Sequence, residues 1–201
     1  MPNLFRSFIA VPLYGLIYQN LADFIQSHNL NTHGAGLRPV KPANIHLTLK
    51  FLGDVESFRI QAIGQALDEE IKSLAPFSID IRGLGAFPAW KKQPRVIWVG
   101  AHPADQLKEL FSRVDTAAAA AGFPPENRDF SPHLTLARIN QQISNPVQHE
   151  LLEKLMNIKP EPVFGQMTVH EVVLFKSLLQ PSGPVYTILS RHSFSGSTVL
   201  C

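Results

Sequence analysis

Cysteine is almost absent from this chain of 201 residues. Its one cysteine is Cys201, which excludes an intrachain disulfide, a cysteine-rich zinc site and an internal thiol nucleophile. So little cysteine fits a reducing compartment, and we expect a cytoplasmic location. The first apolar run carries a single cation and is broken by Pro12, which is not typical of a secretory signal peptide.

Charge of either sign is also scarce. The chain has 18 Lys and Arg against 16 Asp and Glu, a net charge of +2. This charge is too small for a protein that coats duplex nucleic acid, so any contact with nucleic acid must be local. No apolar stretch approaches the roughly 20 residues that cross a bilayer, so we expect no membrane association. A hydrophobic share of 45%, with 13 Phe, excludes global disorder.

Short β-rich runs occur between amphipathic stretches. Apolar residues at helical spacing predict helices over residues 13–28, 57–74, 105–121 and 147–156. Alternating or β-branched runs predict strands over residues 8–11, 45–52, 77–81, 95–100, 133–139, 163–169, 171–177 and 185–192. Residues 29–43 are rich in Asn, Gly and Pro and predict a loop. Strands that occur singly and in hairpins between helices favour an α+β fold.

One tetrapeptide, His-Leu-Thr-Leu, occurs twice, at residues 46–49 and 133–136. At this composition even one copy has a chance probability on the order of a few in a thousand. In a strand, successive side chains point to opposite faces. Each histidine therefore shares a face with its threonine, while the leucines anchor the strand in a core. If two lobes are related by an approximate twofold axis, the two polar faces meet across a cleft.

Two imidazoles and two hydroxyls suit acid–base chemistry at phosphorus. A reference pKa of about 6.5 lets one of His46 and His133 be protonated while the other is neutral. The hydroxyls of Thr48 and Thr135 can donate hydrogen bonds to the oxygens of a phosphoryl group. The pattern fits attack of water on a phosphodiester, in which one histidine takes a proton and the other gives one. This chemistry requires no metal and no cofactor.

Two less specific interpretations compete with catalysis. A histidine in a strand is commonly a structural side chain with satisfied hydrogen bonds, although repetition with the same threonine argues against this. A two-histidine metal site lacks the usual carboxylate or third histidine at these spacings. A third possibility is a module that binds RNA ends or nucleotides without turning them over.

The paired motifs resemble those of the 2H phosphoesterase superfamily. Their surroundings resemble the RNA 2′,3′-cyclic phosphodiesterases, also called 2′-5′ RNA ligases. The resemblance covers nearly the whole chain, and the matching segments are Phe8–Pro12, Asn44–Gly53, Gly85–Pro88, Arg95–Gly100, Phe130–Arg138 and Val173–Ser177 with Tyr186.

The resemblance implies a fold and an activity. Residues 1–201 would form a single domain of two similar lobes, each an antiparallel sheet backed by helices, with the active cleft between them. By position in the family, His46 would protonate the leaving 3′ oxygen and His133 would activate water, leaving a 2′-phosphate. Thr48 and Thr135 would hold the phosphate. The partner would be RNA or an oligonucleotide with a 2′,3′-cyclic phosphate end. We expect a monomer without an obligate protein partner.

The resemblance also implies that Phe51 and Arg138 sandwich the terminal base. Each lies five residues after its histidine, and five is odd. An undistorted strand would therefore turn both side chains away from the histidines. Gly53 permits a bend near Phe51. Core packing for Phe51 and a solvated strand end for Arg138 remain open alternatives.

Several cations flank these motifs. Lys91, Lys92, Arg95 and Arg128 could form a rim that follows single-stranded RNA. The leading hypothesis is hydrolysis, with weak reverse 2′-5′ ligation possible by microscopic reversibility. The sequence does not distinguish tRNA fragments, small nucleotides and ADP-ribose cyclic phosphate as natural substrates.

Overall fold

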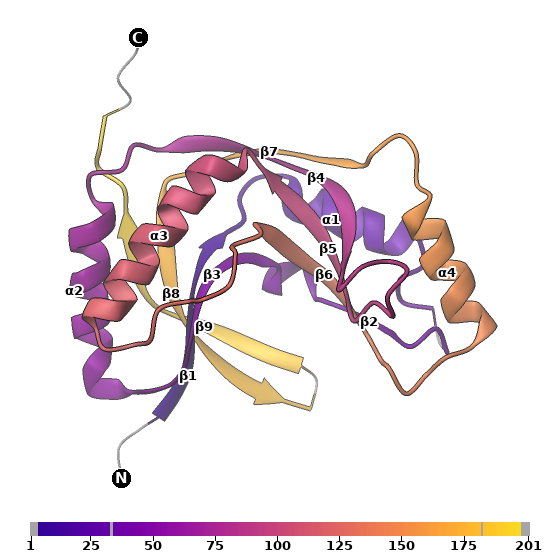
Figure 1. Ribbon diagram of the computed structural model, residues 1–201, viewed down its shortest axis with the longest axis horizontal. Helices are drawn as coiled ribbons and strands as arrows, with labels where there is room; N and C mark the ends of the chain where they lie inside the picture. The colour runs from indigo at the N-terminus through magenta and orange to yellow at the C-terminus, as the bar shows by residue number, and fades with distance from the viewer. Residues whose placement is uncertain (1–3, 33, 182, 198–201) are drawn as a thin grey trace.

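The computed structural model describes residues 4–32, 34–181 and 183–197. This part of the chain forms an α+β fold of two lobes that share one antiparallel sheet (Figure 1). Nine strands pair in the order β7-β4-β5-β6-β3-β1-β8-β9, with β2 alongside β6. The α+β prediction is therefore confirmed.

The elements alternate along the chain. The strands are β1 (Leu4–Pro12), β2 (Leu37–Pro39), β3 (His46–Glu56), β4 (Phe77–Phe87), β5 (Val96–His102), β6 (His133–Ile139), β7 (Val163–Val169), β8 (Glu171–Gln180) and β9 (Gly183–Ser193). The helices are α1 (Ile17–Ser27), α2 (Ile60–Ile71), α3 (Ala104–Ala120) and α4 (Pro146–Met156), with 3-10 turns η1 (Pro42–Asn44) and η2 (Ser57–Arg59).

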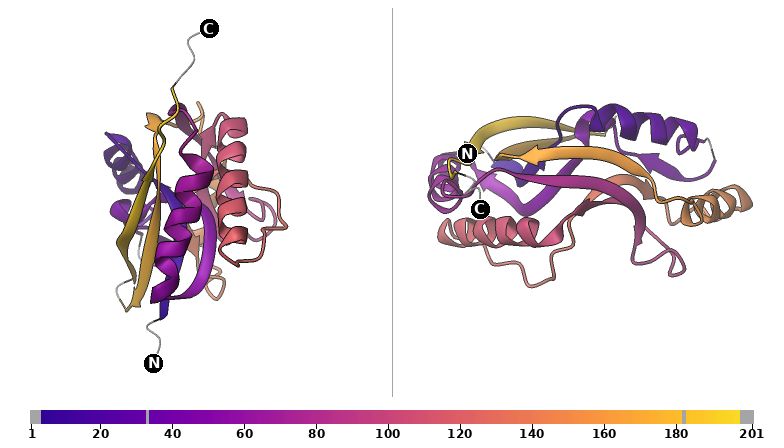
Figure 2. Two further views of the ribbon diagram at one scale, coloured as in Figure 1. Left: turned by 90° about the vertical axis from the view of Figure 1, so that its left-hand side faces the viewer. Right: turned by 90° about the horizontal axis from the view of Figure 1, so that it is seen from above.

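Each lobe has its own strands and helices. In the first lobe, α2 and α3 pack together beside β3, β1, β8 and β9; in the second, α1 and α4 accompany β7, β4, β5, β6 and β2. The two helix pairs lie at opposite ends of the molecule (Figures 1 and 2). The lobes join where β3 meets β6, through the residue pair Leu47–Leu134.

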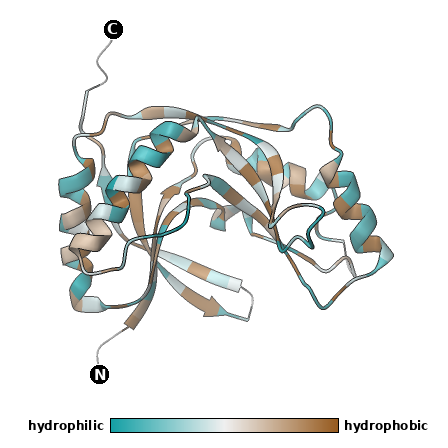
Figure 3. Cartoon of the chain, viewed as in Figure 1, coloured by the Kyte–Doolittle hydropathy of each residue, from teal (hydrophilic) through white to brown (hydrophobic). Residues whose placement is uncertain are grey.

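Apolar side chains fill the space between sheet and helices. The two leucines of the junction, Leu47 and Leu134, are 1% and 0% exposed. Hydrophilic and hydrophobic residues alternate along α3 and α4, as Figure 3 shows. Each helix thus has an apolar side for the core and a polar side for solvent. The leucines of the repeated tetrapeptide therefore anchor both strands, as their pattern predicts.

The first motif strand contains a β-bulge. On the neighbouring strand β1, Ala10 lies opposite Thr48, whereas the preceding residue Ile9 lies opposite Lys50, so Leu49 is an extra residue in β3. A bulge of this kind reverses the alternation of faces beyond it. Leu49 and Lys50 are both buried, and Phe51 emerges on the face of the histidine.

The second motif strand contains a bulge at the equivalent place. Thr135 pairs with Trp98, whereas Ala137 pairs with Ile97, so Leu136 is the extra residue. Arg138 therefore lies on the same face as its histidine. The expectation from strict alternation, that the residues five positions after each histidine point away, is wrong for both strands.

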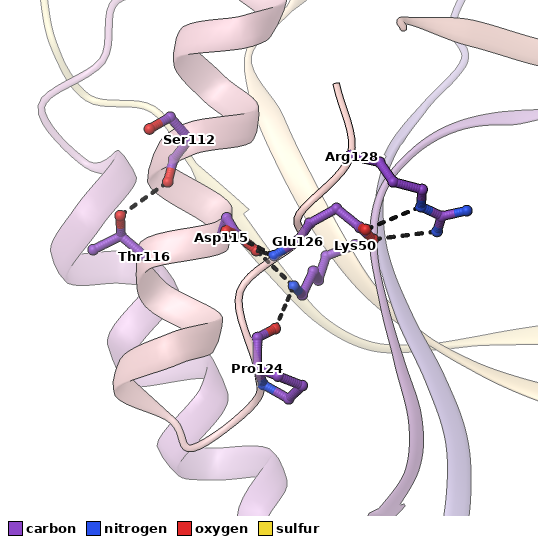
Figure 4. A network of polar contacts seen from close by, with 7 residues as sticks. All are labelled: Lys50, Ser112, Asp115, Thr116, Pro124, Glu126 and Arg128. Carbon is purple, nitrogen blue, oxygen red and sulfur yellow. Dashed lines mark hydrogen bonds and ion pairs between the residues drawn. The ribbon is translucent and has the colours of Figure 1, made fainter. Parts of the chain in front are cut away.

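The bulge in β3 directs a lysine into the interior. Lys50 is 5% exposed, and its Nζ lies 2.6 Å from Oδ1 of Asp115 on α3. The same Nζ donates to the carbonyl oxygen of Pro124 at 2.7 Å, and the backbone N–H of Glu126 donates to Asp115 (Figure 4). This network ties the bulge to α3 and to the segment that leads toward β6.

A second polar contact fixes α2 on β9. Nδ1 of His192 lies 2.7 Å from Oδ1 of Asp68, and its Nε2 lies 2.8 Å from Oγ of Ser190. A Cβ at Gly64 would approach Cε1 of His192 to 3.2 Å, so glycine lets the helix come this close. No spacing pattern in the sequence pairs these residues, because their contact is purely tertiary.

The structure differs from the predicted elements at several ends. Strand β3 continues through Gly53, which has a φ of 70°, instead of stopping there. Helix α1 begins at Ile17 rather than residue 13, because Gly15, with a φ of 64°, turns the chain before it. The predicted loop 29–43 contains β2, which has only 3 residues and is therefore too short to show an alternation of polar and apolar side chains. Of the helices described, none has the length and apolar content to span a bilayer.

Removal of the carboxylate of Asp115 should destabilise the fold. Asp115→Ala leaves the ammonium of Lys50 buried without its counter-charge, and we expect the free energy of unfolding to fall by about 3 kcal/mol. Urea denaturation measures the change.

A surface ion pair provides the matched control. Glu109→Ala removes the exposed pair with Arg113 and should cost less than about 1 kcal/mol. The double variant Lys50→Met with Asp115→Asn, which removes both charges, should be more stable than Asp115→Ala. Equal effects of Asp115→Ala and Glu109→Ala would contradict this account.

Candidate active site

The two motifs meet at the junction of the lobes. Leu47 and Leu134 pair directly, and β3 and β6 run antiparallel. If the same register extends by one residue in each direction, Thr48 lies opposite His133 and His46 lies opposite Thr135. The two histidines are then diagonal neighbours, and such residues have Cβ atoms about 7–8 Å apart. The structure thus places the four motif residues on one face of the sheet, on two neighbouring strands.

Both histidines are held by the same kind of hydrogen bond. Nδ1 of His46 lies 2.8 Å from the carbonyl oxygen of Asn44, and Nδ1 of His133 lies 2.7 Å from that of Ser131. A carbonyl oxygen only accepts, so each Nδ1 carries a hydrogen and donates. Each Nε2 is therefore the nitrogen left for substrate, a base when the ring is neutral and an acid when it is charged.

His46 lies among aromatic rings. Its ring stacks on Phe8 with centroids 4.7 Å apart, and Tyr186 meets it edge-on at 5.3 Å. Burial disfavours the imidazolium and lowers the pKa of His46 to about 4, although the hydrogen bond to Asn44 acts in the opposite direction. His46 is therefore neutral near pH 7.

His133 has a similar environment in the other lobe. Phe87 meets its ring edge-on at 4.9 Å, and the indole of Trp98 lies 6.2 Å away. Burial lowers the pKa of His133 below its ordinary value, opposed by the hydrogen bond to Ser131 and assisted by the charge of Arg138. Aromatic rings thus flank both histidines and reduce their hydration.

The first lobe presents an apolar row beside His46. Phe51, Phe8, Phe175 and Ile188 lie opposite one another on β3, β1, β8 and β9. Phe51 is 67% exposed, and its ring centroid lies 6.2 Å from that of Phe8. Core packing, one of the alternatives for Phe51, is therefore wrong.

The second lobe presents a different row beside His133. Phe87, Val96, Arg138 and Arg38 lie opposite one another on β4, β5, β6 and β2. The charge of Arg138 acts on the pKa of both His133 and Tyr186, which belong to different lobes. The sheet face beside His46 is thus aromatic, and the sheet face beside His133 ends in two arginines.

Trp98 lies flat on the sheet next to Thr135. A Cβ at Gly85 would come within 2.0 Å of the indole, so the ring occupies the space that a side chain there would fill. Its Nε1–H is buried and has no hydrogen-bond partner in the described part of the chain. The sequence resemblance covers both residues but does not indicate this contact.

Two other features of the molecule bear on where a site could lie. A cavity of about 470 Å³ lies between the β4–β5 loop and α4, lined by Trp90, Ile139, Leu152 and others, and includes none of the four motif residues. Among the described residues, no group of three or more His, Cys, Asp or Glu side chains is placed to hold a metal ion. The paired histidines on the open sheet face therefore remain the candidate site.

The sequence of this chain matches a known family and several named relatives. The sequence model of the family described as "LigT like Phosphoesterase" matches the chain over residues 17–98 and again over residues 99–186. A Methanothermobacter thermautotrophicus protein named "RNA 2′,3′-cyclic phosphodiesterase" is 35% identical over 184 residues, covering 90% of this chain and 95% of its own. A Thermotoga maritima protein of the same name is 30% identical over 194 residues, covering 96% and 98%.

Solved structures agree with the sequence comparisons. The crystal structure of E. coli LigT complexed with 3′-AMP superposes with a TM-score of 0.75 at 27% identity, covering 96% of this chain and 99% of that one. Matches to the family model on both halves of the chain, with relatives 30–35% identical over most of it, show that this chain belongs to the LigT-like phosphoesterase family.

Proposed function

We propose that this protein hydrolyses RNA 2′,3′-cyclic phosphate ends to 2′-phosphate ends without a metal ion. The observation that carries the proposal is the pair of histidines on adjacent strands. Each has its Nδ1 bound to a carbonyl oxygen, which leaves Nε2 for substrate. The names of the curated relatives support cyclic phosphodiester ends of RNA as the substrate class.

The reaction is an in-line displacement at phosphorus. Nε2 of neutral His133 takes a proton from water as the water oxygen bonds to phosphorus. The bond from phosphorus to the 3′ oxygen breaks, and Nε2–H of protonated His46 gives its proton to that oxygen. The hydroxyls of Thr48 and Thr135 hold the non-bridging oxygens. Reverse 2′-5′ ligation uses the same groups, but water is the more abundant nucleophile.

Protonation of His46 depends on the substrate. Burial lowers its pKa to about 4, so the acid form of the ring is scarce at neutral pH. A cyclic phosphodiester brings one negative charge next to the ring, and an adjacent opposite charge raises the pKa of a histidine. The bound anion thus creates the acid that its own cleavage requires.

Phe51 and Arg138 sandwich the terminal base in this proposal. The bulges place both on the face of the histidines, one from each lobe. A guanidinium plane and an aromatic ring are both suitable stacking partners for a base. We further propose that residues 1–201 act as one domain, as a cytoplasmic monomer without an obligate protein partner.

Product analysis tests the activity. Incubation of a cyclic-phosphate oligonucleotide with the protein in excess EDTA should give the 2′-phosphate end, identified by its resistance to an enzyme specific for 3′-phosphates. A 3′-phosphate product, complete inhibition by the chelator, or recovery of tightly bound unchanged substrate would each refute the proposal.

Substitution of either histidine tests the coupled mechanism. His46→Ala and His133→Ala should each lower kcat by about 10²–10⁴, because acid and base act in one displacement. The double variant should be little slower than the slower single variant. His149→Ala, on the exposed side of α4, is the control and should keep full activity. Additive losses in the double variant would argue against coupling.

The pH dependence tests substrate-linked protonation. Both kcat and kcat/KM should give bell-shaped profiles, reporting the bound and free enzyme respectively. Because the bound anion raises the pKa of both histidines, the limbs of the kcat profile should lie at higher pH than those of the kcat/KM profile. Initial rates on a nucleoside 2′,3′-cyclic phosphate between pH 4 and 9 measure both. Coincident alkaline limbs would contradict this linkage.

A further inference from the structure

Arg38 lies directly opposite Arg138 on the neighbouring strand. Strand β2 pairs with the end of β6 through Leu37–Ile139, Arg38–Arg138 and Pro39–Ala137. Directly opposed residues of an antiparallel pair share a face, with Cβ atoms about 5 Å apart. Arg38 is therefore on the same face as Arg138 and the histidines.

The pair has no internal counter-charge in the described part of the chain. Neither guanidinium is within ion-pair or hydrogen-bond distance of any side chain or carbonyl there, and both arginines are exposed. Like charges directly opposite each other in a sheet are destabilising. An anion between them removes this repulsion, and guanidinium groups bind phosphate through two parallel hydrogen bonds.

The local backbone keeps both arginines in place. Leu37 is 8% exposed and anchors β2 in the core, and the N–H of Val40 donates to the carbonyl oxygen of Leu136 at 2.8 Å. Leu136 is the bulge residue that turns Arg138 toward the cleft. The bulge at Leu136, which places Arg138, is thus also hydrogen-bonded to the residue that follows β2, the strand that carries Arg38.

The position of the pair determines which phosphate it meets. Arg138 is five residues beyond His133, a path of at most about 17 Å along β6. The anion at the histidines is the cyclic phosphate itself, so the arginine pair is displaced from it along the strand. In an RNA end, the next anion is the phosphodiester that joins the terminal nucleotide to its neighbour.

We propose that Arg38 binds this first internucleotide phosphate together with the edge N–H groups of Arg138, whose planar face stacks on the terminal base, so that an oligonucleotide end is a better substrate than a free nucleotide. This proposal rests on the cyclic phosphodiesterase function proposed above. The arrangement also fits single-stranded RNA generally, because an aromatic wall can take bases while a basic wall follows the backbone.

Three cyclic-phosphate substrates isolate the second phosphate. They are a mononucleotide, a dinucleotide, and the same dinucleotide with a neutral methylphosphonate linkage. Wild-type protein should have a higher kcat/KM on the dinucleotide than on either of the others. Arg38→Gln should lower kcat/KM on the dinucleotide by about 10-fold to 100-fold and change the other two less than about twofold.

Two further variants separate charge from folding. Lys108→Gln removes one positive charge from an exposed side chain of α3 and should leave kcat/KM unchanged on all three substrates. Arg38→Lys should retain most of the preference for the dinucleotide. For binding of the dinucleotide product, the slope of the logarithm of the binding constant against the logarithm of salt concentration should be smaller in magnitude by about 0.7 in Arg38→Gln. The reason is that one phosphate contact is lost.

The outcomes distinguish this proposal from the activity on which it depends. If wild-type protein hydrolyses none of the three substrates, the proposed function itself is wrong. If it hydrolyses all three with equal efficiency, or if Arg38→Gln slows all three by the same factor, the cyclic phosphodiesterase function stands and the second phosphate site is wrong.

Discussion

The structure depends on one contact between two buried leucines. Leu47 and Leu134 form the residue pair through which β3 and β6 join the lobes. Since side chains alternate along both strands, this apolar pair on the inner face places the histidines and threonines together on the outer one. Backbone pairing of β3 with β6 and burial of these two leucines thus set the geometry of the polar site together.

Burial also sets the electrostatic state of that site. The aromatic rings around His46 and His133 exclude water and favour neutral imidazoles, while the backbone carbonyls fix which nitrogen faces outward. In the proposed reaction a neutral ring is ready to act as the base, and the bound anion favours the protonated ring that acts as the acid. The opposed arginines have a related property, because their mutual repulsion falls when an anion binds.

The sequence predicted the fold class and the meeting of the two histidines because both follow from periodicity and repetition. It could not predict where Phe51 and Arg138 point, since a single inserted residue in each strand reverses the alternation, and Leu49 and Leu136 look like ordinary core leucines. Lys50 gives no signal of the bulge either, because undistorted alternation also predicts a polar residue at this position, on the face of His46 and Thr48. Arg38 was missed because β2 is too short to show a pattern, and its pairing is set by distant residues.

The interleaving of the two lobes has a mechanical consequence. The chain passes from β1 in the first lobe to the second lobe and returns to the first for β3 and α2. It then forms β4 and β5 in the second lobe, α3 in the first and β6 in the second, and it enters the first lobe again at β8. A hinge between the lobes would have to bend several connections and one continuous sheet at the same time. Each lobe is therefore built from segments of both halves of the polypeptide, and neither half can be cut away to give an independent lobe.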